Sequence, residues 1–149
     1  MRTITITVAV DVAGALAAAT LTDNLYLFDD NRANGSINQG TSVLKTRVKE
    51  GDRLLWLPLP FEPEVFASIH AIELDARYCE PQRRTYPGSH VVYWEGVVKQ
   101  DLEIAPYRVT FALGDPPGLL SSAENPSLIG DGDRPGGAPG RRETAGKAR

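Results

Sequence analysis

Cysteine, methionine and histidine are nearly absent from this sequence, and their scarcity limits its chemistry. Cys79 is the single cysteine, so no disulfide bond can form within the chain. That usage fits a reducing compartment and predicts a cytoplasmic protein. With one methionine and two histidines, the chain can assemble few sets of transition-metal ligands.

Long apolar runs are also missing. No stretch approaches the roughly 20 residues that a membrane-spanning helix needs. The N-terminal segment ends in Ala17-Ala18-Ala19 and shares some features with a signal peptide. However, threonines alternate through it and Asp11 interrupts it, whereas a secretory core is continuously apolar. The sequence therefore predicts a mature N-terminus and no membrane partner.

Positive charge is scarce, which argues against nucleic acid as the main partner. The formal net charge is -3, and the only dense basic runs are Gln82-Arg83-Arg84 and the C-terminal tail. The hydrophobic content of 42% and charged content of 23% are ordinary for a globular protein. A chain of 149 residues is long enough for one domain with a full core.

Sequence motifs of the common enzyme classes are absent as well. The chain contains no G-x-S-x-G elbow, no H-E-x-x-H zinc motif and no G-x-x-x-x-G-K phosphate loop. Ser89 and His90 are neighbours in sequence, which does not position them for a catalytic triad. These absences favour a protein without enzymatic activity. An enzyme remains an alternative, because convergent sites leave no motif.

Two segments resemble parts of cupredoxins, which makes copper a candidate ligand. A Gly-Asp corner at Val48–Asp52 precedes a tryptophan-bearing strand, and Tyr78-Cys79-Glu80-Pro81 resembles the ligand loop. Blue copper requires two histidines, a cysteine and usually a methionine. Gln82 stands where a histidine is expected, and Met1 is the only methionine. We therefore expect no copper and no other cofactor, with Cys79 acting as a small apolar residue.

A polar loop at residues 29–40 is the place to look for calcium. Its acidic and amide residues are Asp29, Asp30, Asn31 and Asn34. An EF-hand beginning at Asp30 would place Arg32 at the third ligand position and Thr41 at the twelfth, where glutamate is required. An EF-hand is thereby excluded. A solvated loop is favoured, and an irregular calcium site stays open.

The N-terminal segment Thr3–Val10 is the clearest strand of the sequence. Isoleucine and valine alternate with threonine, so one face is apolar and the other polar. The alanine-rich stretch from Asp11 to Thr20 then predicts a short helix, and Asp11 is positioned to cap it.

The stretch Thr41–Phe61 organises the rest of the chain. Its pattern predicts a strand, a tight turn at Glu50-Gly51-Asp52 and a second strand. Leu54 to Leu59 is apolar on both faces, which predicts burial on both sides. Pro58 and Pro60 are expected to end this strand, because each lacks a ladder donor.

Further strands are predicted at Leu25–Phe28, His90–Lys99 and Tyr107–Leu113, and a loop is predicted at residues 75–89. The segment Glu64–Leu74 fits both a strand and a helical face, and its isoleucines favour the strand. Six or seven short strands with little helix predict an all-β fold. We expect an antiparallel β-sandwich, Greek-key or jelly-roll-like, with a short helix near the N-terminus.

The composition changes after Gly114, which divides the chain into three parts. Residues 1–114 are expected to form the β-sandwich domain, and residues 115–129 a C-terminal extension that includes four large apolar side chains. No large apolar residue follows from position 130 onward, so nothing offsets the entropy cost of ordering that segment. Residues 130–149 are therefore predicted to be disordered.

Several segments in the same order resemble the PixA/AidA family of bacterial inclusion-body proteins. They are Val8–Asp11, Asn24–Phe28, Val48–Trp56, Val92–Glu95 and Tyr107–Leu113. The resemblance covers roughly residues 3 to 114. It implies a small β-sandwich that accumulates or self-assembles, and it supplies no catalytic residues to carry over.

Two functions follow as hypotheses. The first is a protein that works by self-assembly, as a homo-oligomer, or by binding another macromolecule. The second is a small-ligand binding module that uses loops 29–40 and 75–89, since loops on a rigid sandwich commonly bind ligands. Candidate contact residues are Asp29, Asp30, Asn31, Asn34, Arg83, Arg84, Tyr86 and His90.

Two features bear on where partners would bind. Trp56, Trp94, Tyr26, Phe28 and Tyr93 can line a pocket, although aromatic side chains on strands more often form the core. The strand Thr3–Val10 has neither charge nor proline. At a sheet edge it would favour pairing with a second copy in a two-fold dimer. The favoured alternative is that neighbouring strands of the same chain cover it.

Overall fold

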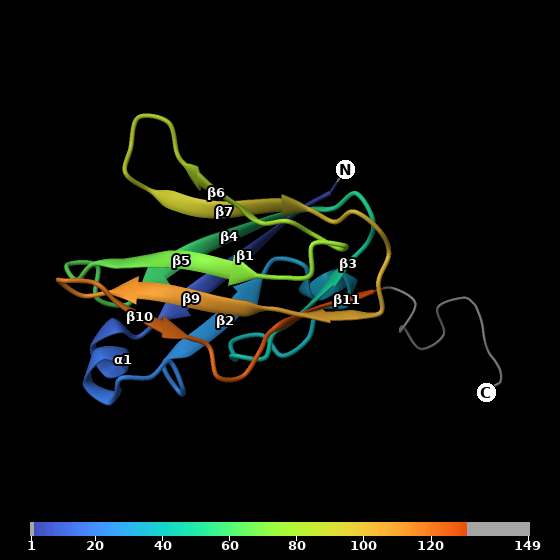
Figure 1. Ribbon diagram of the computed structural model, residues 1–149. Coiled ribbons are helices and arrows are strands. Elements are labelled where there is room, and N and C mark those ends of the chain that lie inside the picture. Colours follow the sequence, from blue (N-terminus) through green and yellow to red (C-terminus); the bar gives the residue numbers. More distant parts are fainter. Residues whose placement is uncertain (1, 131–149) are drawn as a thin grey trace.

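The computed structural model describes residues 2–130, which form two facing layers of β-strands (Figure 1). The strands are β1 (Thr3–Val10), β2 (Leu25–Asp29), β3 (Lys45–Val48), β4 (Arg53–Pro60), β5 (Ala67–Glu73), β6 (Gln82–Thr85), β7 (Val92–Val97), β8 (Ile104–Pro106), β9 (Arg108–Leu113), β10 (Gly118–Ser121) and β11 (Ser127–Gly130). The helices are α1 (Val12–Ala18) and the 3-10 turn η1 (Arg32–Asn34). The prediction of an all-β fold with a short helix near the N-terminus is confirmed.

Three sheets share the core. A five-stranded sheet has the order β2-β1-β4-β7-β6, a three-stranded sheet has the order β10-β9-β5, and a small sheet has the order β3-β11-β8. In Figure 1 the β10-β9-β5 sheet lies in front of β1, β2 and β4, and the β6–β7 hairpin projects above both layers. Most pairs are antiparallel, but β1–β4 and β3–β11 are parallel.

β1 lies in the middle of the five-stranded sheet rather than at an edge. It pairs along its whole length with β4, and its second half pairs with β2. Its backbone groups are therefore used within the chain, as the favoured alternative expected. The hypothesis of a dimer through the edge of Thr3–Val10 is wrong.

The core fills the space between the layers. The isoleucines and valines of β1 are 0–1% exposed, and Trp56 on β4 is 0% exposed. The ring of Trp56 meets that of Tyr107 edge-on, with 5.7 Å between centroids. Phe111 and Ile69 pack into the same core from the opposite sheet. The alternation read from the sequence thus selects the buried face of β1.

The structure contains the predicted helix cap at Asp11 and the predicted turn at Gly51. The Asp11 side chain accepts a hydrogen bond from the Gly14 N–H at 2.9 Å and caps α1 as predicted. Gly51 adopts a φ of 91° between β3 and β4, a conformation that favours glycine. The two strands beside this turn do not pair with each other, because β3 joins β11 and β4 joins β1 and β7.

β4 continues through Pro58 and ends at Pro60, so only the second of the two prolines predicted to end the strand does so. The N–H groups of Arg53 and Phe61 donate hydrogen bonds to carbonyls on the β1 side (2.8 and 2.9 Å). Alternation along a strand then turns the nitrogens of Pro58 and Pro60 to the other side. There the pairing with β7 ends at Trp56, so no donor is missing from the ladder.

The remaining segments confirm some of the predicted secondary structure and add strands that were not predicted. The segment Glu64–Leu74 contains the strand β5, so the strand interpretation is confirmed. The predicted loop 75–89 contains β6, which pairs with β7. Beyond Gly114, β10 pairs with β9, and β11 lies between β3 and β8. Gly130, placed in the predicted tail, ends the buried strand β11. Residues 131–149 lie outside the described part of the chain.

Candidate functional site

The solvent-facing side of the five-stranded sheet carries large apolar side chains of β2, β4 and β7, with the threonines of β1 between those of β2 and β4. Alternation places Leu54 and Trp56 toward the core and turns the intervening leucines outward. We define the outer apolar face as Tyr26, Phe28, Leu55, Leu57, Leu59, Phe61 and Tyr93. Leu59 and Phe61 are 51% and 52% exposed. The prediction that both faces of Leu54–Leu59 are buried is therefore wrong.

Aromatic residues divide between the core and this face. Trp56 is in the core, as the sequence favoured, and the half-buried Trp94 donates a hydrogen bond to the Ile69 carbonyl at 3.0 Å. By contrast, Tyr26 lies on the outer apolar face and its ring stacks on Phe61, with centroids 5.7 Å apart and planes 16° from parallel. The face thus presents ordered rings to solvent.

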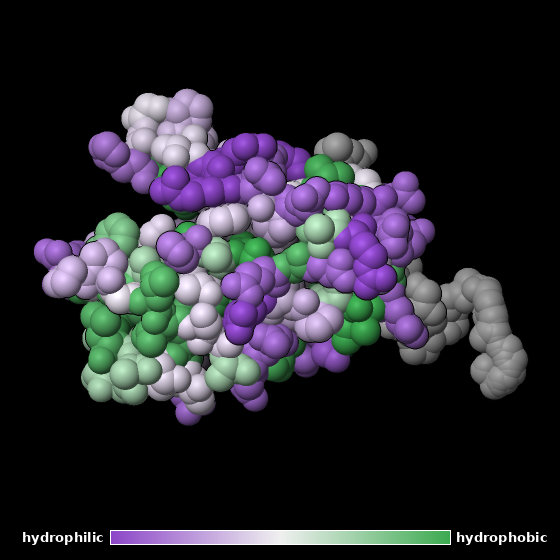
Figure 2. Space-filling model, viewed as in Figure 1, coloured by the Kyte–Doolittle hydropathy of each residue, from purple (hydrophilic) through white to green (hydrophobic). Residues whose placement is uncertain are grey.

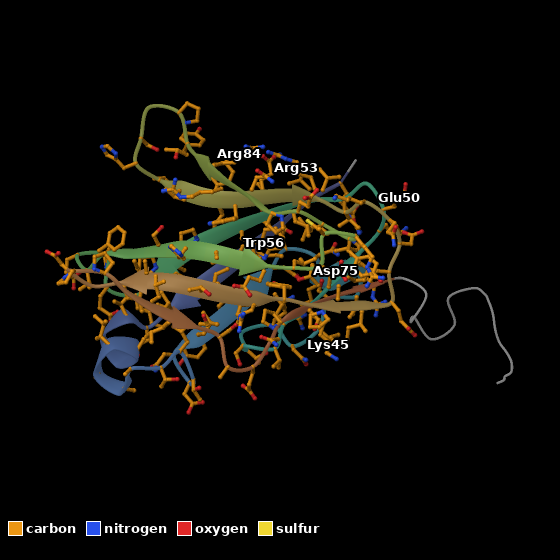
Figure 3. The ribbon with its side chains drawn as sticks, viewed as in Figure 1. Lys45, Glu50, Arg53, Trp56, Asp75 and Arg84 are labelled. Atoms are coloured by element: carbon orange, nitrogen blue, oxygen red, sulfur yellow. The ribbon has the colours of Figure 1, made fainter. Side chains whose placement is uncertain are left out.

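A charged cluster borders the outer apolar face on β4, β6 and β7. The Glu95 carboxylate accepts hydrogen bonds from Arg53 and from Arg84, the latter at 3.2 Å. Figure 3 shows the two arginines close together beside the β6–β7 hairpin. The hydrogen bond from Arg53 is the main cause of a lowered pKa of Glu95, and Arg84 adds to it. The two arginines and Glu95 together carry a net charge of +1.

Replacing Glu95 with glutamine is expected to destabilise the protein at neutral pH only. A lowered carboxyl pKa in the folded state contributes stability above the unfolded pKa, and that contribution is lost as pH falls through the folded value. The melting point of Glu95→Gln should lie a few degrees below that of the parent at about pH 7 and should converge with it below about pH 4. Thermal unfolding at several pH values measures this difference. A constant gap at all pH values would contradict the charge-based explanation.

A groove of about 340 Å³ lies where the hairpin meets the outer apolar face. Leu55, Leu57 and Tyr93 form its floor and sides, Tyr86 and Val91 come from the hairpin tip, and Arg53 closes one end. Tyr86 and Val91 are 62% and 57% exposed. The groove extends the apolar surface of the sheet onto the hairpin.

A second recess lies on the opposite side of the hairpin, between it and the start of β5. This hairpin cleft has a volume of about 330 Å³. Its lining comprises Pro58, Phe66, Ala67, Ser68, Arg83, His90, Val91 and Val92. Arg83 and His90 were candidate contact residues on sequence alone, whereas Phe66 and Pro58 were not. No motif links these segments, and only the fold brings them together.

The acidic residues of loop 29–40 are used inside the fold. Asp29 accepts hydrogen bonds from the side chains of Gln39 (2.7 Å) and Thr46 (2.8 Å). Asp30 accepts one from the Thr5 N–H at 3.0 Å and so extends the ladder of β1 beyond β2. These carboxylates stabilise a fixed loop.

The two amides of the same loop have a similar structural role. Buried Asn31 donates to the Arg47 carbonyl at 2.7 Å, and Asn34 donates to Asn31 at 3.0 Å. This loop follows β2, while Arg83 and Arg84 lie on β6, at the other edge of the sheet. Four strand spacings of about 4.8 Å separate the edges by about 19 Å. The two predicted loops therefore do not form one site.

Metal-binding groups are dispersed in the described residues. Among residues 2–130, no three His, Cys, Asp or Glu side chains are placed to hold a metal ion. Cys79 is buried, and its sulfur would lie 2.5 Å from a Cβ built on Gly96. Burial raises the pKa of the Cys79 thiol to about 11. No helix in the same residues is long and apolar enough to cross a membrane.

Residues 2–117 match a family described as a domain of unknown function, DUF8788. The chain belongs to this family. No curated protein matches this DUF8788 member. Its fold is similar to the crystal structure of an inclusion body protein, PixA, from Burkholderia cenocepacia J2315. The TM-score is 0.71 at 14% identity, over 87% of this chain and 95% of that one. The similarity shows a shared fold with PixA, which the sequence motifs had suggested.

Proposed function

We propose that this protein has no enzymatic activity and works by associating with copies of itself through the outer apolar face. The observation that supports this most directly is the exposure of Leu59, Phe61 and Phe28, at 51%, 52% and 43%, on one face of one sheet. Sheets with one solvated face normally carry polar residues there. An apolar face with stacked rings suits packing against a second sheet, as in the interior of a sandwich.

Two exposed sheet edges, those of β6 and β5, are less suited to assembly than this face. Strand β6 is fully exposed but carries Gln82, Arg83 and Arg84, and charged side chains discourage edge pairing. The β5 edge is interrupted by a bulge at Ile69/Ala71. A hydrogen bond from Trp94 to the Ile69 carbonyl also covers part of that edge. Contact between faces is therefore the better-supported arrangement.

The dimensions of the face suit a weak interface. The face runs from β2 to β7, three strand spacings or about 14 Å, and the eight residues of β4 span about 26 Å. Their product is on the order of 400 Å² for each partner, or about 800 Å² in total, which is in the range of weak, transient interfaces. A two-fold dimer through the face would be isologous, because each copy presents the same residues.

The structural neighbour agrees with this proposal. PixA is described as an inclusion body protein, and accumulation of a protein in inclusion bodies requires copies to associate. The present chain shares that fold at 14% identity, so the proposal depends on its own exposed residues rather than on any residue of the neighbour.

The double variant Leu59→Glu/Phe61→Glu is expected to be a folded monomer. Each glutamate would be desolvated at the interface without a partner, which costs several kcal/mol for an unpaired buried charge. The dissociation constant of self-association should rise by about 100-fold or more. Sedimentation velocity over a range of concentrations measures this, with circular dichroism to confirm the fold.

A matched control changes two equally exposed residues elsewhere. Leu16 on α1 and Leu119 on β10 are 45% and 57% exposed. Apolar surface gathers around the end of the molecule where α1 and β10 lie (Figure 1, Figure 2). Leu16→Glu/Leu119→Glu should retain the parental oligomeric state. If this control disperses the oligomer and the first variant does not, the interface includes Leu16 and Leu119 instead of the outer apolar face. A parent protein that is strictly monomeric at high concentration would overturn the proposal.

A further inference from the structure

The hairpin cleft contains polar side chains that the fold does not use. Arg83 and His90 line it from the two sides of the hairpin, and Ser68 lines it from β5. Within residues 2–130 none of these three side chains makes a hydrogen bond or an ion pair. By comparison, the acidic loop at residues 29–40 has its carboxylates bonded internally. The cleft is therefore the place where recognition groups remain available.

Strand alternation directs Arg83 toward this cleft. Arg83 pairs with Trp94 across the β6–β7 ladder, and cross-strand partners share a face. That face is the inner one, because Trp94 donates to the Ile69 carbonyl of β5. The next residue, Arg84, lies on the opposite face and bonds Glu95. Two adjacent arginines thus have different surroundings.

The charge of the cleft is positive. Arg83 is its charged residue, and no aspartate or glutamate lines it. Glu95, the nearest carboxylate along the ladder, is on the outer side with Arg53 and Arg84. A guanidinium without a carboxylate partner matches the planar oxygens of a carboxylate or phosphate group, which it can hold by two parallel hydrogen bonds.

The rest of the lining is apolar. Pro58, Phe66 and Ala67 form one side, and Val91 and Val92 the other. Phe66 is 52% exposed, so its ring is accessible to a ligand. The volume of about 330 Å³ lies at the small end of ligand-binding pockets. It suits a body of about one ring or a short acyl chain.

We propose that the hairpin cleft binds a small organic anion, with a carboxylate or phosphate group held by Arg83 and His90 and an apolar body against Phe66. This site is separate from the outer apolar face, although Val91 borders the recesses on both sides of the hairpin. Ligand binding is therefore a second property of the fold that does not rest on self-association.

The test uses the full chain and three small probes that share one ring. Benzoate carries a carboxylate, phenyl phosphate carries a phosphate, and benzyl alcohol has neither charge. Isothermal titration calorimetry of the parent protein should show saturable binding of at least one anion and none of the alcohol. The stronger of the two anions identifies the head group, and inorganic phosphate shows whether the apolar body is needed.

Adjacent arginines provide the matched variants. Arg83→Gln is expected to weaken anion binding by about tenfold or more, since a hydrogen bond to a charged group is lost. His90→Ala should weaken it as well. Arg84→Gln, one residue away on the other face, should bind as the parent does. Equal losses in Arg83→Gln and Arg84→Gln would overturn the proposal, as would a parent protein that binds neither anion at millimolar concentration.

Discussion

Replacing Trp56 with alanine is expected to remove a large part of the free energy of unfolding. Trp56 is 0% exposed and packs edge-on against Tyr107, which is 2% exposed. Emptying a buried aromatic site costs about 3–5 kcal/mol, and a domain of this size has only about 5–15 kcal/mol in total. Urea unfolding followed by fluorescence and circular dichroism measures the loss.

Trp56→Phe distinguishes the effect of lost side-chain volume from the effect of the buried indole N–H. The Trp56 indole N–H and the Tyr107 hydroxyl are buried without a hydrogen-bond partner within the described residues. Trp56→Phe keeps a ring in the core and removes an unsatisfied donor, so its loss should be clearly smaller than that of alanine. If Trp56→Ala unfolds at the parental urea concentration, Trp56 does not support the core.

Local sequence signals predicted much of the fold. The alternation in Thr3–Val10 identified both the strand and its buried face, and Asp11 marked the start of α1. These signals are local because hydrogen bonds and side-chain direction repeat along a few residues. Sheet partners depend on distant segments instead. The parallel pairing of β1 with β4 and the place of β11 between β3 and β8 therefore required the structure.

The difference between local signals and contacts with distant segments also explains why the candidate surfaces were predicted only in part. A strand such as Leu54–Leu59, apolar on both faces, predicts two covering layers, but the structure covers only the side of Trp56. Composition cannot distinguish a second layer of the same chain from a surface left for a partner. Arg83 and His90 were named from their loop, yet the cleft also requires Phe66 from a segment that precedes β5. The cleft forms where the two sheets pack together, and no local pattern in the sequence predicts that packing.

A chain ending at Asn125 is expected not to fold, whereas one ending at Gly130 should fold normally. The shorter chain loses β11, the central strand of the β3-β11-β8 sheet, with Leu128 at 0% and Ile129 at 5% exposure. It also removes the Gly130 carbonyl that accepts a hydrogen bond from buried Arg47. Losing each aliphatic side chain costs about 2–5 kcal/mol. The longer chain should melt within a few degrees of the parent, because residues 131–149 include no large apolar side chain.

A single methyl group at Gly130 tests the same strand without shortening the chain. A Cβ built at Gly130 would lie 1.7 Å from the Leu102 carbonyl oxygen and 2.9 Å from its carbon, so backbone atoms would have to move. Gly130→Ala should cost at least the roughly 1–3 kcal/mol typical of overpacking. Gly118 on β10 has no atom within 4 Å of such a Cβ, so Gly118→Ala should be neutral or slightly stabilising. Urea midpoints of the two variants measure the difference. Equal midpoints would show that β11 does not pack against Leu102.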